Sequence, residues 1–193
     1  MEHLSEAARK LTALLACKSD TPVEHSFTEY ELALIWLRLR QQGLDNWLFP
    51  SSDICSYEKF KECALSPSVW CYAGFSHETG EPCALALLDG FQGKTARLHY
   101  TFFRNEEALR DKEKYARAFF DLLFENKTLD ALLLGTPKPF RHSNSFARSL
   151  GAVYLGDVPS LVGVKNWKTG ELSYPLTSFY TLVSPHYNQP IRM

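Results

Sequence analysis

Three short apolar or alternating runs, each followed by a glycine-containing turn or a polar helix start, constrain this chain more than any other feature. The runs lie at 69–75, 83–88 and 96–103, and the turns that join them at 77–81 and 89–93. Runs of this length separated by tight turns are typical of an antiparallel β-meander. In the third run, Leu98 and Tyr100 alternate with His99 and Thr101, which predicts two different faces.

A long helical pattern and a second kind of apolar run follow the meander. Asn105 is a candidate N-cap for a helix over 105–123, and the residues 129–134 form a run that is apolar except at Asp130. Such a run is typical of a strand buried on both faces. A helix between two strands of one sheet acts as a crossover, so we expect 129–134 to pair parallel with 96–103. The fold class is therefore mixed α/β.

The flanking segments complete one predicted domain over 1–193. We expect helices at 4–15, 28–39, 56–63 and about 141–150, and strands at 152–155, 161–164 and 176–183. Residues 1–22 read as a helical extension and 184–193 as a loose tail. The first strand of the fold is either the short stretch 47–49 or absent.

Charge and cysteine content exclude several classes of protein. With 21 basic and 22 acidic residues the net charge is −1, which gives no reason to expect nucleic acid or an anionic membrane as partner. No apolar run is long enough to span a bilayer, and the first residues lack a secretion signal, so we expect a cytoplasmic protein. The five cysteines show neither a disulfide framework nor a zinc pattern, which predicts free thiols and no metal.

The segment after the crossover helix resembles the GNAT superfamily of acyl-CoA N-acyltransferases. It consists of the run 129–134, the loop Gly135-Thr136-Pro137, and a helix ending in Phe146-Ala147-Arg148-Ser149-Leu150-Gly151. Within the superfamily it is similar to the divergent GNAT-like proteins of tailed phages. Over 69–183 the resemblance implies a mostly antiparallel twisted sheet with central splayed parallel strands and helices on both faces. It also implies acetyl-CoA or another acyl-CoA as cofactor, and direct attack by an amine without a covalent intermediate.

The phosphate-binding motif of that superfamily is degenerate here. Family members place a Gln/Arg-x-x-Gly-x-Gly/Ala motif at the start of the crossover helix, because glycine lets the backbone approach the pyrophosphate. Aligned on Arg110, this chain has Glu113 and Tyr115 at the small positions, and no glycine lies between Lys94 and Leu134. The tyrosine that family members use as general acid falls near Ala147.

Candidate site residues follow from the chemistry of acyl transfer, which needs a base for the ammonium proton and an oxyanion donor at the thioester carbonyl. His99 is the candidate base, because an imidazole titrates near neutral pH and the predicted strand places it where the splay should open. Tyr154 is the candidate acid. The candidate coenzyme contacts are Phe102, Phe103, Arg104, Arg110, Lys114 and Asn144. Each also has a purely structural interpretation, as a core residue or as part of a salt-bridged helix.

Two functions remain open at this point. The first is an N-acyltransferase that transfers an acetyl or acyl group to an unknown small-molecule or protein amine. The second is a non-catalytic GNAT-fold protein of a phage or prophage that binds another protein, for example in virion assembly. The absent glycines favour the second function, and the complete order of elements favours the first.

Overall fold

The computed structural model describes residues 27–49, 54–76, 79–125, 129–159, 162–166 and 169–185. The predicted helix 4–15, the extension 1–22 and most of the tail 184–193 lie outside the described residues. Among the helices within those ranges, none is both long and apolar enough to cross a membrane.

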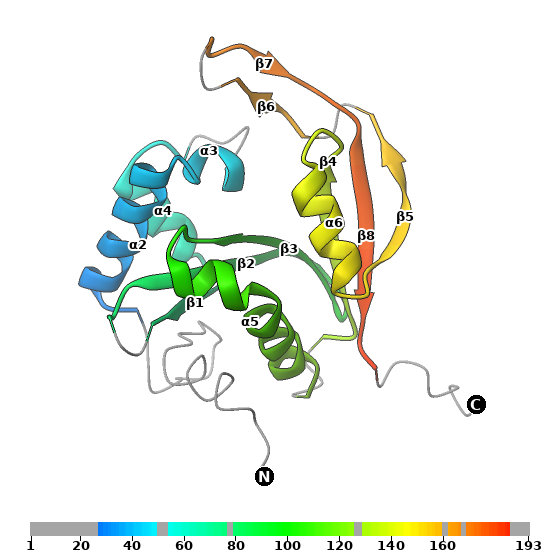
Figure 1. Cartoon of the computed structure of the whole chain (residues 1–193), viewed down its shortest axis with the longest axis horizontal. Helices are drawn as coiled ribbons and strands as arrows, with labels where there is room; N and C mark the ends of the chain where they lie inside the picture. The colour runs from blue at the N-terminus through cyan, green and yellow to red at the C-terminus, as the bar shows by residue number, and fades with distance from the viewer. Residues whose placement is uncertain are drawn as a thin grey trace.

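A six-stranded sheet organises the molecule, in the order β1-β2-β3-β4-β8-β5 (Figure 1). Only β3 and β4 pair parallel, and every other neighbouring pair is antiparallel. The strands are β1 (Trp70–Phe75), β2 (Pro82–Gln92), β3 (Thr95–Phe102), β4 (Ala131–Pro137), β5 (Val153–Val158) and β8 (Thr177–Val183). The predicted meander and the predicted parallel pairing are both confirmed.

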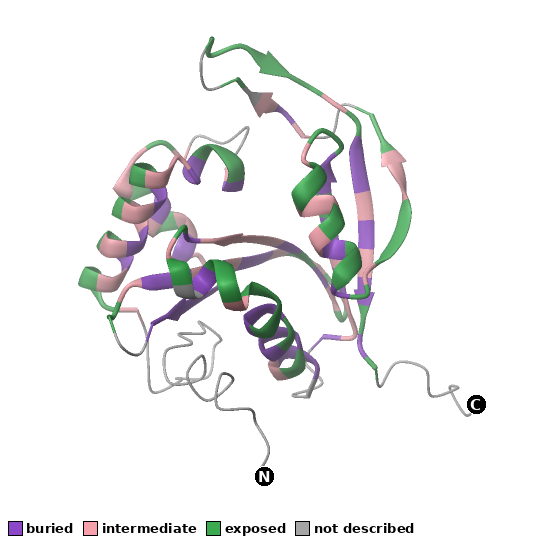
Figure 2. Ribbon diagram, viewed as in Figure 1, coloured by how far each residue is buried: buried purple, intermediate pink, exposed green. Residues whose placement is uncertain are grey.

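Helices cover both faces of this sheet. On one face, α2 (Glu29–Gln42), α3 (Asp45–Leu48) and α4 (Tyr57–Ala64) pack on β1, β2 and the end of β3. On the other face, α5 (Glu106–Glu125) and α6 (Arg141–Ser149) bury a second core that reaches β8. Figure 2 shows that the buried positions of α5 lie on the side turned toward the sheet. This arrangement confirms the predicted fold class.

Local sequence signals explain several boundaries. A capping box between Thr28 and Glu31 starts α2, and Gly43 ends it with φ of 65°, a backbone conformation that favours glycine. The alternative of a first strand at 47–49 is wrong, because most of that stretch belongs to the short helix α3. The predicted strand at 161–164 gives only the start of β6 (Val164–Lys165), which forms a separate hairpin with β7 (Leu172–Ser173).

The two parallel strands diverge soon after they pair. Their ladder joins Thr95–Arg97 to Ala131–Leu133 and ends there in the described part of the chain. Beyond it, 98–102 remains paired with β2 and 134–137 with β8, so the two segments face each other unpaired. We call this gap the β3–β4 opening. Pro137 favours the divergence because it has no N–H for a ladder.

Candidate active site

A histidine, a carboxylate and a guanidinium lie together at the β3–β4 opening. Asp89 of β2 stands directly opposite Arg97 of β3, and His99 lies two residues further along β3 on the same face. Arg97 binds Asp89 through two hydrogen bonds, from Nε to Oδ1 at 2.7 Å and from Nη2 to Oδ2 at 2.9 Å. His99 Nε2 lies 3.3 Å from Asp89 Oδ1. The side chain of His99 is 37% exposed and so remains accessible.

The charge state of Asp89 determines which nitrogen of His99 is basic. Burial alone would raise the pKa of Asp89, but hydrogen bonds from His99 and Arg97 together hold the pKa of this carboxyl far below its usual range. An ionised carboxylate only accepts hydrogen bonds, so Nε2 of His99 must carry the proton that it shares with Asp89. The lone pair of the neutral ring therefore lies on Nδ1. Asp89 acts as the group that orients a base.

These residues border a cleft of about 420 Å³ on the side of the sheet covered by α3 and α4. That volume lies within the range of pockets that hold small molecules. The described residues that line this cleft are Trp47, Leu48, Phe49, Ile54, Cys63, Val69, Leu87, Asp89, Arg97, Leu98, His99, Tyr100, Leu134, Gly135, Thr136, Pro137, Phe140, Ser143, Val162 and Phe179. We call it the acceptor-side cleft.

Aromatic rings form much of the wall of the acceptor-side cleft. The rings of Trp47 on α3 and Phe140 before α6 lie 4.3 Å apart, so they join the two halves of the molecule across the cleft. Phe179 of β8 lies beside Gly135 of β4, where an added Cβ would come within 3.2 Å of the phenyl ring. Glycine at this position therefore lets the Phe179 ring pack directly against β4.

One thiol also borders the acceptor-side cleft. Burial, and to a smaller extent the charge of Asp89, raises the pKa of Cys63. A thiol with a raised pKa stays protonated at neutral pH and is a poor nucleophile. The arrangement therefore favours direct attack by an acceptor over a thioester with the protein.

The opposite side of the β3–β4 opening is filled by aromatic side chains. Phe146 of α6 packs on Tyr100 and Phe102 of β3, with ring centroids 5.8 and 5.5 Å apart. Lys112 of α5 lies over the Phe146 ring at 5.4 Å. A small apolar cavity of about 40 Å³ remains between this cluster and Tyr115 on α5. We call Tyr100, Phe102 and Phe146 the aromatic plug.

The hydroxyl of Tyr100 is buried and has no hydrogen-bond partner among the described residues. Burial raises the pKa of this phenol well above its usual value, so it stays protonated and can donate a hydrogen bond. Buried polar groups are nearly always satisfied in folded proteins. The unpaired hydroxyl therefore points to a missing partner at the β3–β4 opening.

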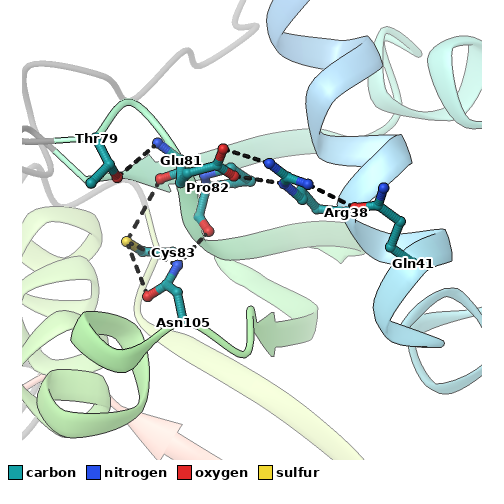
Figure 3. Close-up of polar contacts among 7 residues, drawn as sticks. All are labelled: Arg38, Gln41, Thr79, Glu81, Pro82, Cys83 and Asn105. Atoms are coloured by element: carbon teal, nitrogen blue, oxygen red, sulfur yellow. Dashed lines mark hydrogen bonds and ion pairs between the residues drawn. The ribbon is translucent and has the colours of Figure 1, made fainter.

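The start of α5 is occupied by the chain's own side chains. Asn105 Oδ1 accepts a hydrogen bond from the N–H of Ala108 at 2.7 Å, which confirms Asn105 as the N-cap. Its Nδ2 donates to the carbonyl of Pro82 at 3.0 Å, and its amide also contacts the thiol of Cys83 (Figure 3). Just before the helix, the N–H of Arg104 donates to Gln42 Oε1. The chain's own side chains therefore already bind two of the N–H groups that an anion such as a pyrophosphate would otherwise find here.

The other predicted site residues are distributed over the molecule. Phe103 is fully buried beneath α2, and its N–H donates to the carbonyl of Cys83. The side chains of Arg104 and Lys114 are exposed, and Arg110 pairs with Asp111 at 3.0 Å. Phe102, already described, is a predicted coenzyme contact whose side chain belongs to the aromatic plug.

Asn144 and Tyr154 lie apart from His99. Asn144 donates to the carbonyls of Pro137 and Phe140 and accepts from Tyr180, so it anchors the start of α6. Tyr154 lies on the edge strand β5, which β4 and β8 separate from β3. The structure does not bring this tyrosine to the cleft.

Sequence reasoning missed Asp89, the partner of His99. The residues 89–93 were expected to form a turn because of Gly90 and Gly93, but β2 continues to Gln92 and the turn follows at Gly93. The strand continues through an irregularity between Asp89 and Gln92, where Gly90 has φ of 57°. An Asp at the first position of the expected turn, with an Arg near the start of the next run, was the available signal.

Comparison with known proteins shows the fold. No protein-family model and no curated protein sequence matches the chain. Among solved structures, spermidine N-acetyltransferase from Vibrio cholerae, in complex with CoA and spermine, matches with a TM-score of 0.68 and 10% identity, over 92% of this chain and 99% of that one. Ribosomal-protein-S5-alanine acetyltransferase from Vibrio fischeri matches with a TM-score of 0.63 and 11% identity, over 82% and 88% of the two chains. The chain has the fold of GNAT acetyltransferases, and at such low identity the reaction must be argued from the site.

Proposed function

We propose that this chain is an acyl-CoA-dependent N-acyltransferase in which His99 is the general base. The observation that carries the proposal is that the His99–Asp89–Arg97 group lies at the point where the parallel strands separate and borders a cleft of about 420 Å³. A base, a group that orients it and space for a substrate are the parts that acyl transfer to an amine requires.

His99, Asp89 and Arg97 each have a distinct role in the proposed reaction. A bound acyl-CoA supplies a thioester whose carbonyl carbon is open to attack. Nδ1 of His99 accepts the proton that an ammonium must lose before its nitrogen can act as a nucleophile. The free amine would then form a bond to the carbonyl carbon while the carbon–sulfur bond breaks, and CoA would leave as a thiol with the second proton of the nitrogen. Asp89 holds the ring through Nε2 and stabilises the positive charge that the ring gains, while Arg97 keeps Asp89 in place.

The β3–β4 opening and the start of α5 differ in how well they fit a coenzyme. The unpaired edges 98–102 and 134–137 offer main-chain groups, and the unpaired Tyr100 hydroxyl offers a donor, to an amide-bearing arm. At the start of α5, Asn105 already binds the N–H of Ala108, so fewer donors remain for a pyrophosphate. We therefore propose that exposed basic side chains, Arg104 and Lys114, meet the phosphates instead.

Calorimetric titration of the full chain with CoA and acetyl-CoA tests the proposal, followed by an acetyl-transfer assay on a panel of amines. We expect saturable binding of both ligands and transfer that depends on His99. Absence of heat at ligand concentrations that saturate ordinary GNAT enzymes would overturn the proposal.

A second candidate function rests on the closed aromatic plug and on the exposed edge strand β5. Four apolar side chains of β5, those of Val153, Tyr154, Leu155 and Val158, are exposed at the end of the sheet (Figure 2). Edge strands of this kind are common places for protein association. Under this candidate the chain is a non-catalytic GNAT-fold protein, such as a phage product that binds another protein during assembly. The same titration separates the two, because this candidate requires no CoA binding.

A further inference from the structure

We propose that the acceptor-side cleft takes a primary amine carried on a single apolar, aromatic-sized group, and that it discriminates against polyamines. This inference rests on the proposed function, because it names the acceptor for the same site. The two features that carry it are the balance of charge in the cleft and the aromatic character of its walls.

The charge balance leaves room for one cationic group at most. Among the described residues that line the cleft, Asp89 and Arg97 are the only ones with a formal charge besides the titratable His99. Both oxygens of Asp89 are already bound by Arg97, and one of them is also shared with His99. A ligand with several ammonium groups would bring charges that no free carboxylate of these residues could balance, and burying an unbalanced charge is costly.

The walls suit a flat apolar group. Trp47 and Phe140 form a tilted pair of rings, and Trp47 is 51% exposed, so part of its surface is available to a ligand. Phe49 and Phe179 add aromatic surface on other sides of the cleft, and Gly135 lets the Phe179 ring pack directly against β4. Aromatic rings bind one another in tilted or offset geometries, and their faces also attract a single ammonium group.

Titration calorimetry with two simple amines tests the inference, on the full chain with and without saturating CoA. We expect 2-phenylethylamine, which carries one ammonium on an aromatic group, to bind at least tenfold more tightly than spermidine. Trp47→Ala should weaken binding of 2-phenylethylamine at least tenfold and leave spermidine unchanged. Tyr174→Ala is the matched control, because Tyr174 is 55% exposed and does not line the cleft, and it should change neither affinity.

A variant that adds a carboxylate to the cleft tests whether the charge balance excludes polyamines. Ser143 lines the cleft in the first turn of α6, where the helix dipole tolerates a carboxylate. Ser143→Asp should raise the affinity for spermidine at least fivefold and leave 2-phenylethylamine within twofold of the native value.

The outcomes separate this inference from the proposed function. If CoA binds but spermidine binds as tightly as 2-phenylethylamine, the inference is overturned and the acyltransferase stands. If 2-phenylethylamine is preferred but CoA does not bind, the amine site stands and the acyltransferase is overturned. Binding of neither amine, with or without CoA, overturns the inference.

Discussion

The two sides of the β3–β4 opening are built from neighbouring residues of one strand, yet they differ in almost every property. On the side of α3 and α4, His99 borders an open cleft and is held by an ion pair. On the side of α5 and α6, Tyr100 and Phe102 are covered by Phe146, and the Tyr100 hydroxyl lacks a partner. Under the proposed function, the comparison teaches that the acceptor side is already assembled in this structure, whereas the coenzyme side must rearrange before it can receive a ligand.

We expect that rearrangement to involve a side chain of α6 rather than the strands of the sheet. The edges of the opening are already separated, and each strand is held by its outer neighbour. The aromatic plug depends on Phe146, while Asn144 anchors the start of the same helix through three hydrogen bonds. A rotation of the Phe146 side chain would open the plug and leave these bonds intact.

Of the four substitutions, His99→Ala should reduce the rate of acyl transfer most. It tests whether the acceptor side supplies the general base. We expect the rate of acyl transfer to fall by about 10²- to 10⁴-fold, the usual contribution of a general base, with the CoA dissociation constant unchanged. Steady-state kinetics and calorimetry measure the two quantities. His142→Ala, an exposed histidine of α6, is the control and should leave the rate unchanged. An unchanged rate in His99→Ala would contradict the assignment of the base.

Asp89→Asn should reduce the rate less, by roughly 10- to 100-fold, because the base survives but loses the group that orients it. The same substitution should also change how the free energy of unfolding depends on pH. The folded state lowers the pKa of Asp89, so the stabilisation from its ionised form is present above about pH 4, the unfolded pKa, and is lost as pH falls through the folded value. Urea unfolding at pH 7, 4 and 2.5 should show the difference between native chain and variant shrinking toward low pH. A difference that stays constant over this range would refute the role of the ion pair.

Phe146→Ala would remove the contrast between the two sides. Truncating a partly buried phenylalanine should lower the free energy of unfolding by about 2 kcal/mol. If the plug blocks the opening, CoA should nevertheless bind roughly tenfold more tightly, because the competent state no longer has to displace the ring. Calorimetry and chemical denaturation give the two values. Leu109→Ala, an exposed apolar residue of α5 outside both cavities, is the control. Weaker CoA binding in Phe146→Ala would indicate that the ring contacts the ligand rather than blocking it.

Tyr100→Phe should give the smallest change in CoA binding, because it removes a single hydroxyl group. Removing an unpaired buried hydroxyl is expected to stabilise the unliganded chain, with a rise in the melting midpoint of about 2–4 °C. The same change should weaken CoA binding about fivefold if the ligand provides the missing partner. Thermal melting with and without CoA measures both effects. A lower midpoint in the absence of ligand would show that the hydroxyl is satisfied in solution.

The order of elements and the parallel pairing could be predicted because they depend on local patterns. The largely apolar run 129–134 after a long amphipathic helix left few other topologies, and the alternation in 96–103 separated His99 from Tyr100 correctly. The opening was also expected close to where it is found. Periodicity and connection rules act over short stretches of chain, so one sequence is enough to apply them.

The partners of the site residues could not be predicted because they depend on register and on distant packing. Asp89 meets Arg97 only because β2 continues past Gly90, and the register of two strands cannot be read from either alone. Trp47 reaches Phe140 across 93 positions of sequence, and Phe146 meets β3 through the placement of α6. A short apolar stretch such as 47–49 is equally compatible with a strand or a helix, which is why that alternative was wrong.

Both sides of the β3–β4 opening use side chains of β3. A change in the length of this strand would therefore disrupt both sides. Because side chains alternate between the two faces, inserting or deleting one residue between Lys94 and Leu98 would turn the Tyr100 phenol toward the cleft and the imidazole toward α5. Natural variants of this chain should therefore keep the spacing from the turn at Gly93 to His99, even where most of the intervening side chains have been replaced.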